Sequence, residues 1–364
     1  MKSTKAVFHR RMLRASLAAT AILTGLATGA HGQLFVGLES SAPLTKSSDL
    51  SGFPDVAWTN RFSFDVSGAA AAPDRTLYLC NGAFTTRLYT STLSGPPTLR
   101  STLSVDIHAL AWGRGKLYGY SNFATTKGIY EIDVNSGACT LVLDVHTGTS
   151  FRYFGLDYNP IDDLFYGYTE YGDSGLYAIN IDTGTQTKIA GPIPASNSQG
   201  RALAVGRNTV YITATRGADG IPHYAYDLSQ GPNGQWVAFT QSYTESNATG
   251  GAAYIAQYGF DITLGLMGDC PGRLEARVNS ATRSGRVAII YARGMGNVTI
   301  PSGPCAGTRL GLNNTATLAA LIDADGDGNA ALARNVGSNV CGGRLVLQAL
   351  DLTTCSPSNV VATP

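Results

Sequence analysis

The chain has 364 residues, of which 44% are hydrophobic, only 14% are charged and 43 are glycine. This apolar content excludes an intrinsically disordered chain, and the length is sufficient for two domains with cores of their own. The formal charge of +1 reflects 26 Lys and Arg against 25 Asp and Glu, so the strongly basic composition of a nucleic-acid binder is also excluded. Composition therefore says more about architecture than about activity.

The first 32 residues predict an export signal. A basic stretch without any acid is followed by an uncharged stretch at 15–30 and by the small-x-small sequence Ala30-His31-Gly32. This layout is typical of a cleaved secretory signal peptide, and its apolar part is shorter than the ~20 residues that span a bilayer. Arg10-Arg11 loosely matches a twin-arginine signal, but we favour the general secretory route. We expect a protein that is secreted or at the cell surface, with no membrane span.

Six cysteines in an exported chain favour disulfides. Four of them follow residue 264: Cys270, Cys305, Cys341 and Cys355. Three pairings among these four are possible, and the sequence does not choose between them. Cys80 and Cys139 lie earlier, and whether they pair is equally open. Because no Cys-x-x-Cys pair occurs, neither zinc nor redox chemistry is predicted.

A repeat of forty-odd residues is the strongest pattern in the chain. A Leu-Tyr phrase recurs, and we take five positions in it as equivalent: Val36, Tyr78, Tyr118, Tyr166 and Tyr211. A strand of small apolar residues precedes the phrase, as at 108–112 and 154–158. An alternating strand, a glycine turn and an outer strand follow it. Four short antiparallel strands in each repeat of about 40–50 residues indicate a propeller blade.

The two ends of the repeat array complement each other. Residues 250–255 resemble an innermost strand, whereas residues 34–39 read as a second strand with no innermost strand before them. Joined, these segments complete one blade and leave no sheet edge open. We therefore predict an all-β chain in which residues 33–264 form a five-bladed β-propeller, closed by the N- and C-terminal strands of the array. An irregular β-solenoid of the same repeats is the alternative.

The repeat phrase, Leu-Tyr-Gly followed by Ile-Asp-x-x-x-Gly-x-x-Thr, resembles that of secreted planctomycete-type bacterial β-propeller proteins. Residues 176–184 are also similar to a pyrroloquinoline-quinone-type repeat. The chain's three tryptophans share no repeat register, however, so no quinone cofactor is predicted. Residues 302–307 and 350–359 are similar to C-terminal modules of the same secreted proteins. The resemblance implies a cysteine-containing β-sandwich after the propeller and no assigned reaction.

Residues 265–364 read as a second domain. Short alternating strands, such as 274–278 and 287–291, are separated by turns rich in Gly, Asn and Ser. Seven or so strands in about a hundred residues are typical of an immunoglobulin-like β-sandwich. We predict that this module is disulfide-bonded.

An Asp-rich segment in this module matches the opening of a calcium loop. Asp323, Asp325 and Asp327 alternate and are followed by glycine, as in such loops. The match ends at the twelfth position, where Arg334 replaces the expected Glu. A tight β-hairpin turn accounts for the same residues and is our preferred interpretation. Calcium at the three aspartates is the alternative, and no other cofactor is predicted.

Carboxylates near the innermost strands are the best enzymatic candidates. The sequence has no P-loop, no Gly-x-Ser-x-Gly elbow and no metal-binding His pair. Asp65, Asp106 and Asp157 lie at or near successive innermost strands, and glycoside hydrolysis needs two carboxylates with opposed environments. Structural turn and capping roles explain the same residues and are preferred.

Binding residues are expected around the propeller funnel. His108 begins an innermost strand, and a tyrosine cluster at 153–171, including Tyr158 and Tyr166, suggests a stacking surface for sugars. We favour a secreted, non-enzymatic binding or scaffold protein whose funnel takes an extracellular glycan, peptide or surface polymer. A carbohydrate-active hydrolase using Asp106 and Asp157 is the alternative, and a purely structural surface component is the third hypothesis.

Overall fold

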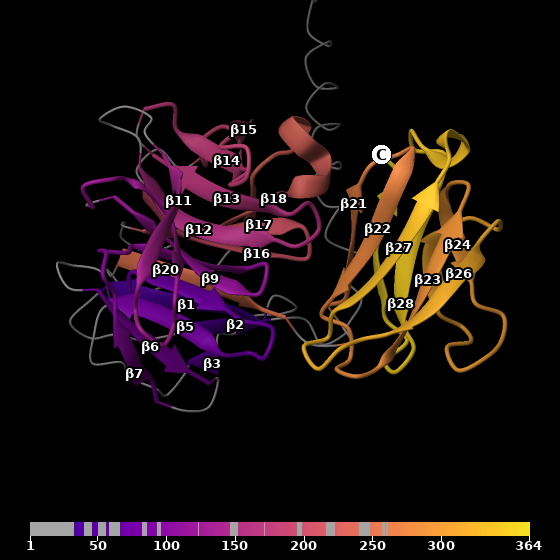
Figure 1. Cartoon of the computed structure of the whole chain (residues 1–364), viewed down its shortest axis with the longest axis horizontal. Helices are drawn as coiled ribbons and strands as arrows, with labels where there is room; N and C mark the ends of the chain where they lie inside the picture. The colour runs from indigo at the N-terminus through magenta and orange to yellow at the C-terminus, as the bar shows by residue number, and fades with distance from the viewer. Residues whose placement is uncertain are drawn as a thin grey trace, which may run out of the picture. The chain divides into compact units, whose positions relative to one another are not determined.

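The computed structural model of the chain is nearly all β (Figure 1). It describes residues 33–39, 46–49, 56–57, 66–81, 86–92, 96–122, 124–145, 152–170, 172–194, 199–215, 223–239, 248–256, 259 and 261–364. The predicted export signal, Asp65 and Tyr171 lie outside the described residues.

Five four-stranded antiparallel sheets account for the repeats. The first pairs β20 (Ala248–Ile255), β1 (Gln33–Glu39), β2 (Lys46–Asp49) and β3 (Val56–Ala57) in that order. The second contains β4 (Gly68–Ala71), β5 (Leu77–Asn81), β6 (Arg87–Ser91) and β7 (Thr98–Thr102). The third contains β8 (Ala109–Gly113), β9 (Lys116–Ser121), β10 (Gly128–Ile132) and β11 (Cys139–Asp144).

The remaining two repeat sheets follow the same order. One contains β12 (Tyr153–Asn159), β13 (Leu164–Thr169), β14 (Gly175–Ile179) and β15 (Gln186–Ala190). The other contains β16 (Gln199–Gly206), β17 (Thr209–Thr215), β18 (His223–Asp227) and β19 (Val237–Phe239), with the short 3₁₀ helix η1 (Leu228–Asn233) before β19. Strands β1 and β20 are far apart in the sequence yet pair along their length, and they are the two segments that the sequence analysis joined.

Small side chains allow the innermost strands to approach one another. Strand β4 contacts β8, β8 contacts β12, β12 contacts β16, β16 contacts β20, and β20 contacts β4. Ala70, Ala111, Ala204 and Ala253 are all completely buried on these strands. A Cβ atom added to Gly68 would lie only 3.0 Å from the Cα of Ala109, so a larger residue there would push two sheets apart. Radial four-stranded sheets that meet at their first strands are the β-propeller architecture.

The strand register corrects the repeat alignment by one residue. Tyr118 is opposite Ala111 and Tyr78 is opposite Ala70. In the blade that joins both ends, Phe35 is opposite Ala253, the equivalent position. Phe35, and not Val36, is therefore the counterpart of the repeated tyrosine. Leu34-Phe35 therefore corresponds to the Leu-Tyr pair of the other repeats, whereas the sequence alignment had placed Val36 at the tyrosine position.

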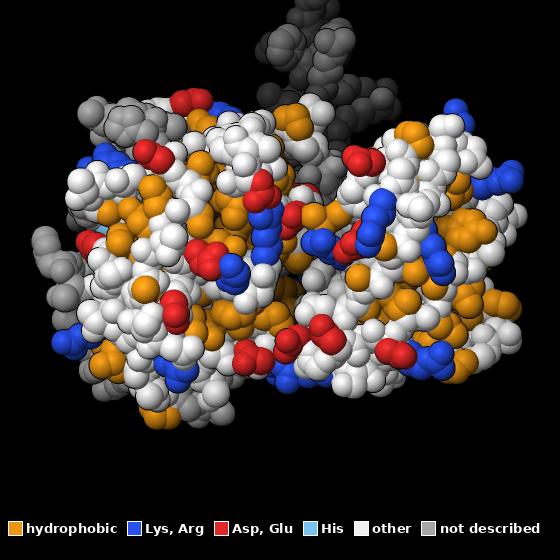
Figure 2. Space-filling view, in the orientation of Figure 1, with side chains coloured by type: hydrophobic (Ala, Val, Ile, Leu, Met, Phe, Trp, Pro, Cys, Tyr) orange, Lys and Arg blue, Asp and Glu red, His pale blue; other side chains and the backbone are white. Residues whose placement is uncertain are grey.

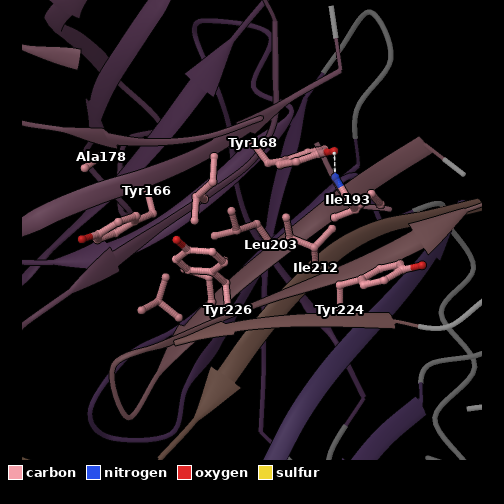
Figure 3. Close-up of a cluster of buried hydrophobic side chains, with 11 residues drawn as sticks. Tyr166, Tyr168, Ala178, Ile193, Leu203, Ile212, Tyr224 and Tyr226 are labelled. Atoms are coloured by element: carbon pink, nitrogen blue, oxygen red, sulfur yellow. Dashed lines mark hydrogen bonds between the residues drawn. The ribbon is translucent and has the colours of Figure 1, made fainter. Parts of the chain in front are cut away.

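Hydrophobic side chains fill the spaces between neighbouring sheets. Figure 3 shows one such cluster, in which Tyr166 and Tyr168 from β13 lie near Leu203 from β16 and Tyr226 from β18. The Tyr168 hydroxyl accepts a hydrogen bond of 3.1 Å from the backbone N–H of Ile193. Tyrosine suits these spaces because its ring is buried while its hydroxyl finds a partner near the rim.

The C-terminal module contains three further sheets. One is β21 (Thr263–Gly268), β22 (Gly272–Asn279) and β27 (Ala330–Val336), and another is β26 (Thr317–Asp323), β23 (Arg286–Ala292), β28 (Val346–Asp351) and β29 (Pro357–Ala362). The third is the ribbon of β24 (Met295–Thr299) and β25 (Arg309–Leu312). A 3₁₀ turn, η2, covers Ser338–Val340. Strand β21 begins at Thr263, two residues before the predicted boundary.

The module is a sandwich with an extra layer. Leu264 and Val278 of the three-stranded sheet pack in one core with Val287 and Ile289 of the four-stranded sheet. On the other face of the four-stranded sheet, Leu312 of the ribbon packs in a second core. The sequence had predicted the ribbon strands as ordinary members of a two-layer sandwich, and they cover its outer face instead.

Two disulfides join parts of the module. Cys270 pairs with Cys341, and Cys305 pairs with Cys355. Cys80 and Cys139 are free thiols. Cys80 is completely buried between blades, and that burial raises the pKa of its thiol to about 12.

Two further features are the hydrophobicity of the helices and the distribution of charge on the surface. Among the described residues, no helix has the length and apolar character needed to cross a membrane. On the face shown in Figure 2, basic and acidic side chains are interspersed, and the basic ones do not merge into a continuous surface.

Candidate functional site

A hollow lies where the innermost strands of the propeller end, and aromatic residues line it. Trp112, Tyr158 and Tyr254 all contribute to its wall. They occupy the same register position in three blades, opposite Leu117, Phe165 and Leu34 of the second strands. The pairings that establish this are those of β8 with β9, β12 with β13, and β20 with β1. The repeat therefore delivers three aromatic side chains to one rim.

These rings pack on the neighbouring blade. A Cβ atom on Gly113 would lie 2.6 Å from the Tyr158 ring, and a Cβ on Gly206 would clash with the ring of Tyr254. Trp112 stacks on Tyr78, with ring centroids 5.2 Å apart and planes 9° from parallel. Each ring thus seals the space between two blades, while Trp112 and Tyr158 stay partly exposed at the hollow.

An arginine links turns of two blades beside these rings. Arg114, in the turn between β8 and β9, has its Nε 2.8 Å from a carboxylate oxygen of Asp163 and its Nη2 2.8 Å from one of Asp182. The Tyr158 hydroxyl donates to the same Asp163. Hydrogen bonding from Arg114 lowers the pKa of Asp182. The arginine and both carboxylates line the hollow.

Asp157 is the buried carboxylate of the hollow. One carboxylate oxygen accepts the N–H of Tyr158 at 2.9 Å, and the other accepts the N–H of Val205, on the next blade, at 2.7 Å. Asp157 as a whole residue is 8% exposed, and burial raises the pKa of its carboxyl group to about 7. The register places alanine at the equivalent position in the other four repeat sheets: Ala70, Ala111, Ala204 and Ala253.

Asp106 and His108 form a separate polar pair. The Thr86 hydroxyl donates a 2.6 Å hydrogen bond to Asp106, and His108 Nε2 lies 3.5 Å from the other oxygen of that carboxylate. Burial lowers the pKa of His108, and the nearby Arg152 acts in the same direction while Asp106 opposes it. Neither member of the pair lines the hollow. His108 therefore lies away from the aromatic rim.

The two predicted catalytic carboxylates are not brought together. Asp106 precedes β8, and Asp157 lies near the end of β12. The start of β12 lies near the start of β8, because Tyr153 packs against Tyr120, which is opposite Ala109. The end of β12 lies near the end of β8, because Tyr158 packs on Gly113. Strands β8 and β12 therefore run side by side in the same direction. Asp157 lines the hollow, whereas Asp106 does not. The hollow therefore does not hold these two residues as the pair of carboxyl groups, about 5–10 Å apart, that glycoside hydrolysis requires.

The tyrosine cluster divides into core and rim. Tyr166 is 4% exposed and packs among hydrophobic residues of two blades (Figure 3). Its hydroxyl donates a 2.6 Å hydrogen bond to Asp162. Tyr153 and Tyr168 are also buried. Tyr166 thus presents no ring face for stacking, contrary to the expectation for it, because its side chain points between blades. Of the two tyrosines singled out, only Tyr158 lines the hollow.

The Asp-rich segment forms a turn between β26 and β27, which belong to different sheets, so it is not the β-hairpin turn that the sequence suggested. Asp325 accepts the backbone N–H groups of Asp327 and Asn329 at 2.9 and 2.8 Å. Asp323 lies 3.6 Å from Arg286. Across the part of the chain that the structure describes, no group of three or more His, Cys, Asp or Glu side chains is placed to hold a metal ion. Calcium binding at Asp323, Asp325 and Asp327 stays a prediction.

Sequence reasoning missed three residues of the hollow. Trp112 and Tyr158 both end the predicted innermost strands at 108–112 and 154–158, and Tyr254 lies one residue before the end of the predicted strand at 250–255. The recurrence of an aromatic residue near the end of these strands was the available signal. Arg114 was not singled out from the sequence. Its role depends on Asp163 and Asp182, which are 49 and 68 residues away in the sequence.

Comparisons with known proteins do not assign the chain to a family. No family model matches it, and no curated protein matches it. A Bacteroides thetaiotaomicron protein of unknown function is similar in structure, with a TM-score of 0.42 and 17% identity over 71% of this chain and 68% of that one. An exo-β-1,3-galactanase from Phanerochaete chrysosporium gives a TM-score of 0.40 and 13% identity over 85% and 92%. BamB from Moraxella catarrhalis gives 0.29 and 12% over 82% and 90%. These likenesses are too distant to assign an activity.

Proposed function

We propose that this chain is a non-enzymatic binding protein whose five sheets form a closed five-bladed propeller, and that a glycan binds in its aromatic hollow. The observation that carries the proposal is the recurrence of Trp112, Tyr158 and Tyr254 at one register position around the hollow. Concave sites with aromatic walls and a few convergent polar groups are typical of small-ligand binding. Carboxylates and guanidinium groups beside the rings provide hydrogen-bond partners for sugar hydroxyls.

The closed ring rests on the pairing of β1 with β20 and on the contact of β20 with β4. With this closure, the N-terminal strand locks the last blade, and the rim keeps a constant shape for a ligand. The C-terminal module is proposed to be an immunoglobulin-like sandwich with the added ribbon. We also propose export through cleavage before Gln33, which the N-terminal sequence of the protein recovered from a secreting host would test.

A glycan array followed by titration tests the binding function. Trp112 lies at the hollow, so a saccharide that binds there should change the intrinsic tryptophan fluorescence. Trp112→Ala should weaken binding at least tenfold, because a stacking surface is lost. Leu99→Ala, at a side chain that is 52% exposed on the outer strand β7, is the control and should bind normally. If no saccharide binds, or if Trp112→Ala binds as well as the parent, the proposal fails.

A further inference from the structure

The charged groups of the hollow are unbalanced. The residues that line it include six carboxyl groups, from Asp74, Asp157, Asp163, Asp182, Asp261 and Asp327, against three guanidinium groups, from Arg114, Arg207 and Arg277. Burial raises the pKa of Asp157 to about 7, and with that group protonated at pH 6 the carboxylates still outnumber the guanidinium groups by five to three. Carboxylates of the same sign in a concave site raise the local concentration of cations and repel anions. The aromatic rim and the acidic wall therefore occupy one hollow.

None of the three guanidinium groups is unpaired, and that of Arg277 lies 2.6 Å from Glu275. Arg114 is held between Asp163 and Asp182 by four hydrogen bonds of 2.8–2.9 Å from its Nε, Nη1 and Nη2. Arg207 lies 3.8 Å from Asp261, whose side chain is 1% exposed. An anionic ligand would have to break these ion pairs and would leave Asp261 buried without its counter-charge.

A buried hydroxyl in the wall makes no well-formed hydrogen bond. Tyr254 is 8% exposed and lines the hollow, and its hydroxyl group has no close hydrogen bond within the described residues, although the carboxylate of Asp261 is near enough to interact with it. A buried polar group without a partner is costly, and a ligand that supplies the partner removes that cost. Burial, with the negative charge of Asp261 nearby, raises the pKa of Tyr254 well above its ordinary value, so the hydroxyl stays protonated.

We propose that the ligand of the hollow carries ammonium groups, and specifically that it is an oligosaccharide of amino sugars. This inference rests on the proposed glycan-binding function and names the chemical class of its ligand. The amines complement the net negative wall, the sugar rings lie along the aromatic rim, and a ligand group pairs with the Tyr254 hydroxyl. A partly exposed tryptophan such as Trp112 also attracts cations through its ring face.

The test compares three tetrasaccharides of equal length by calorimetric titration at pH 6 and low salt. The probes are a glucosamine tetramer, its fully N-acetylated neutral counterpart and a galacturonic acid tetramer. The glucosamine tetramer should bind at least tenfold more tightly than the neutral one, and the acidic one should not bind. Because exposed charges are screened by salt, raising the ionic strength to 0.5 M should reduce that preference.

Tyr254→Phe isolates the contribution of the wall. The change keeps the ring on Gly206 and removes only the hydroxyl, which makes no close hydrogen bond in the protein, so thermal stability should change little while glucosamine-tetramer affinity falls several-fold. Tyr211→Phe is the matched control, because Tyr211 stacks on Tyr254 with centroids 5.9 Å apart but does not line the hollow. Equal affinities for the parent and Tyr254→Phe would overturn the role of this hydroxyl.

The outcomes separate the two proposals. If the N-acetylated or acidic tetramer binds as tightly as the glucosamine tetramer, the inference about charge is overturned while glycan binding stands. If no saccharide of any charge binds on the array, the proposed function itself fails.

Discussion

The propeller and the C-terminal module are both built from antiparallel sheets, yet their sheets are held together by different means. In the propeller, both described cysteines are free, and the rings of Tyr158 and Tyr254 close the spaces between blades over glycines. In the module, two disulfides span 71 and 50 residues of sequence. Asn359 adds a polar clamp, because its amide both donates to and accepts from the backbone of Leu264.

The difference shows how repeated packing between sheets can take the place of disulfide bonds. A repeated sheet meets its neighbours through the same strand each time, so one solution can recur, and a ring of one blade packs over a glycine of the next at Gly113 and at Gly206. The module has no repeat, and its sheets and ribbon each meet different partners. Cross-links and side-chain clamps then define an arrangement that packing alone specifies less strongly.

Reduction of the disulfides should produce the largest contrast between the two regions. Closing loops of 71 and 50 residues stabilises a chain by about 4 kcal/mol each in the loop-entropy treatment. A reducing agent should therefore lower the unfolding temperature of the module sharply. All three tryptophans precede residue 263, so tryptophan fluorescence reports on the propeller and should show an unchanged transition. Calorimetry with and without reductant measures the module, and a parallel shift of the fluorescence transition would contradict the comparison.

Truncation of a ring between blades should have the opposite selectivity. Tyr153 is completely buried, packs edge-on against Tyr120 and Tyr177, and donates a 2.7 Å hydrogen bond to Gln186. Tyr153→Ala should cost about 3–4 kcal/mol of propeller stability, as expected for the loss of a large buried ring. Chemical denaturation followed by tryptophan fluorescence measures it. Leu99→Ala, on an outer strand, should change stability by less than about 0.5 kcal/mol.

The same contrast explains what could be predicted from the sequence. The repeat specified the four-strand order of each sheet and the joining of residues 34–39 to 250–255, because both depend on local alternation and turn residues. The disulfide pairing was undetermined, because it depends on how non-repeated strands meet. The hollow was only partly predicted: Tyr158 and Tyr166 lie on neighbouring strands, and only the contacts between blades determine which of them reaches the rim.

A single methyl group should test whether glycine at a seam is required. A Cβ atom on Gly206 would clash with the Tyr254 ring, and the neighbouring blade leaves that ring little room to move. Gly206→Ala should destabilise the propeller by about 1–3 kcal/mol, the usual cost of overpacking. Gly191→Ala is the matched control, because no heavy atom lies within 4 Å of its added Cβ. Equal denaturation midpoints for the two variants would show that the ring moves freely.

Asp157 should give the smallest and most specific effect, through pH. Its pKa is raised by burial to about 7, above the ordinary value of 3.8, so the folded propeller binds this proton more tightly than the unfolded chain does. The stabilisation is therefore fully present below about pH 4 and is lost as the pH rises through 7, at no more than about 1.4 kcal/mol per pH unit. Asp157→Ala introduces the residue found at this position in the other four repeat sheets. Because the substitution also removes two hydrogen bonds, the measurement compares how the free energy of unfolding changes with pH and not its absolute value. That slope, from denaturation at pH 5 to 8, should become flatter in Asp157→Ala. Identical slopes in the parent and the variant would show that the carboxyl group is ionised throughout this range.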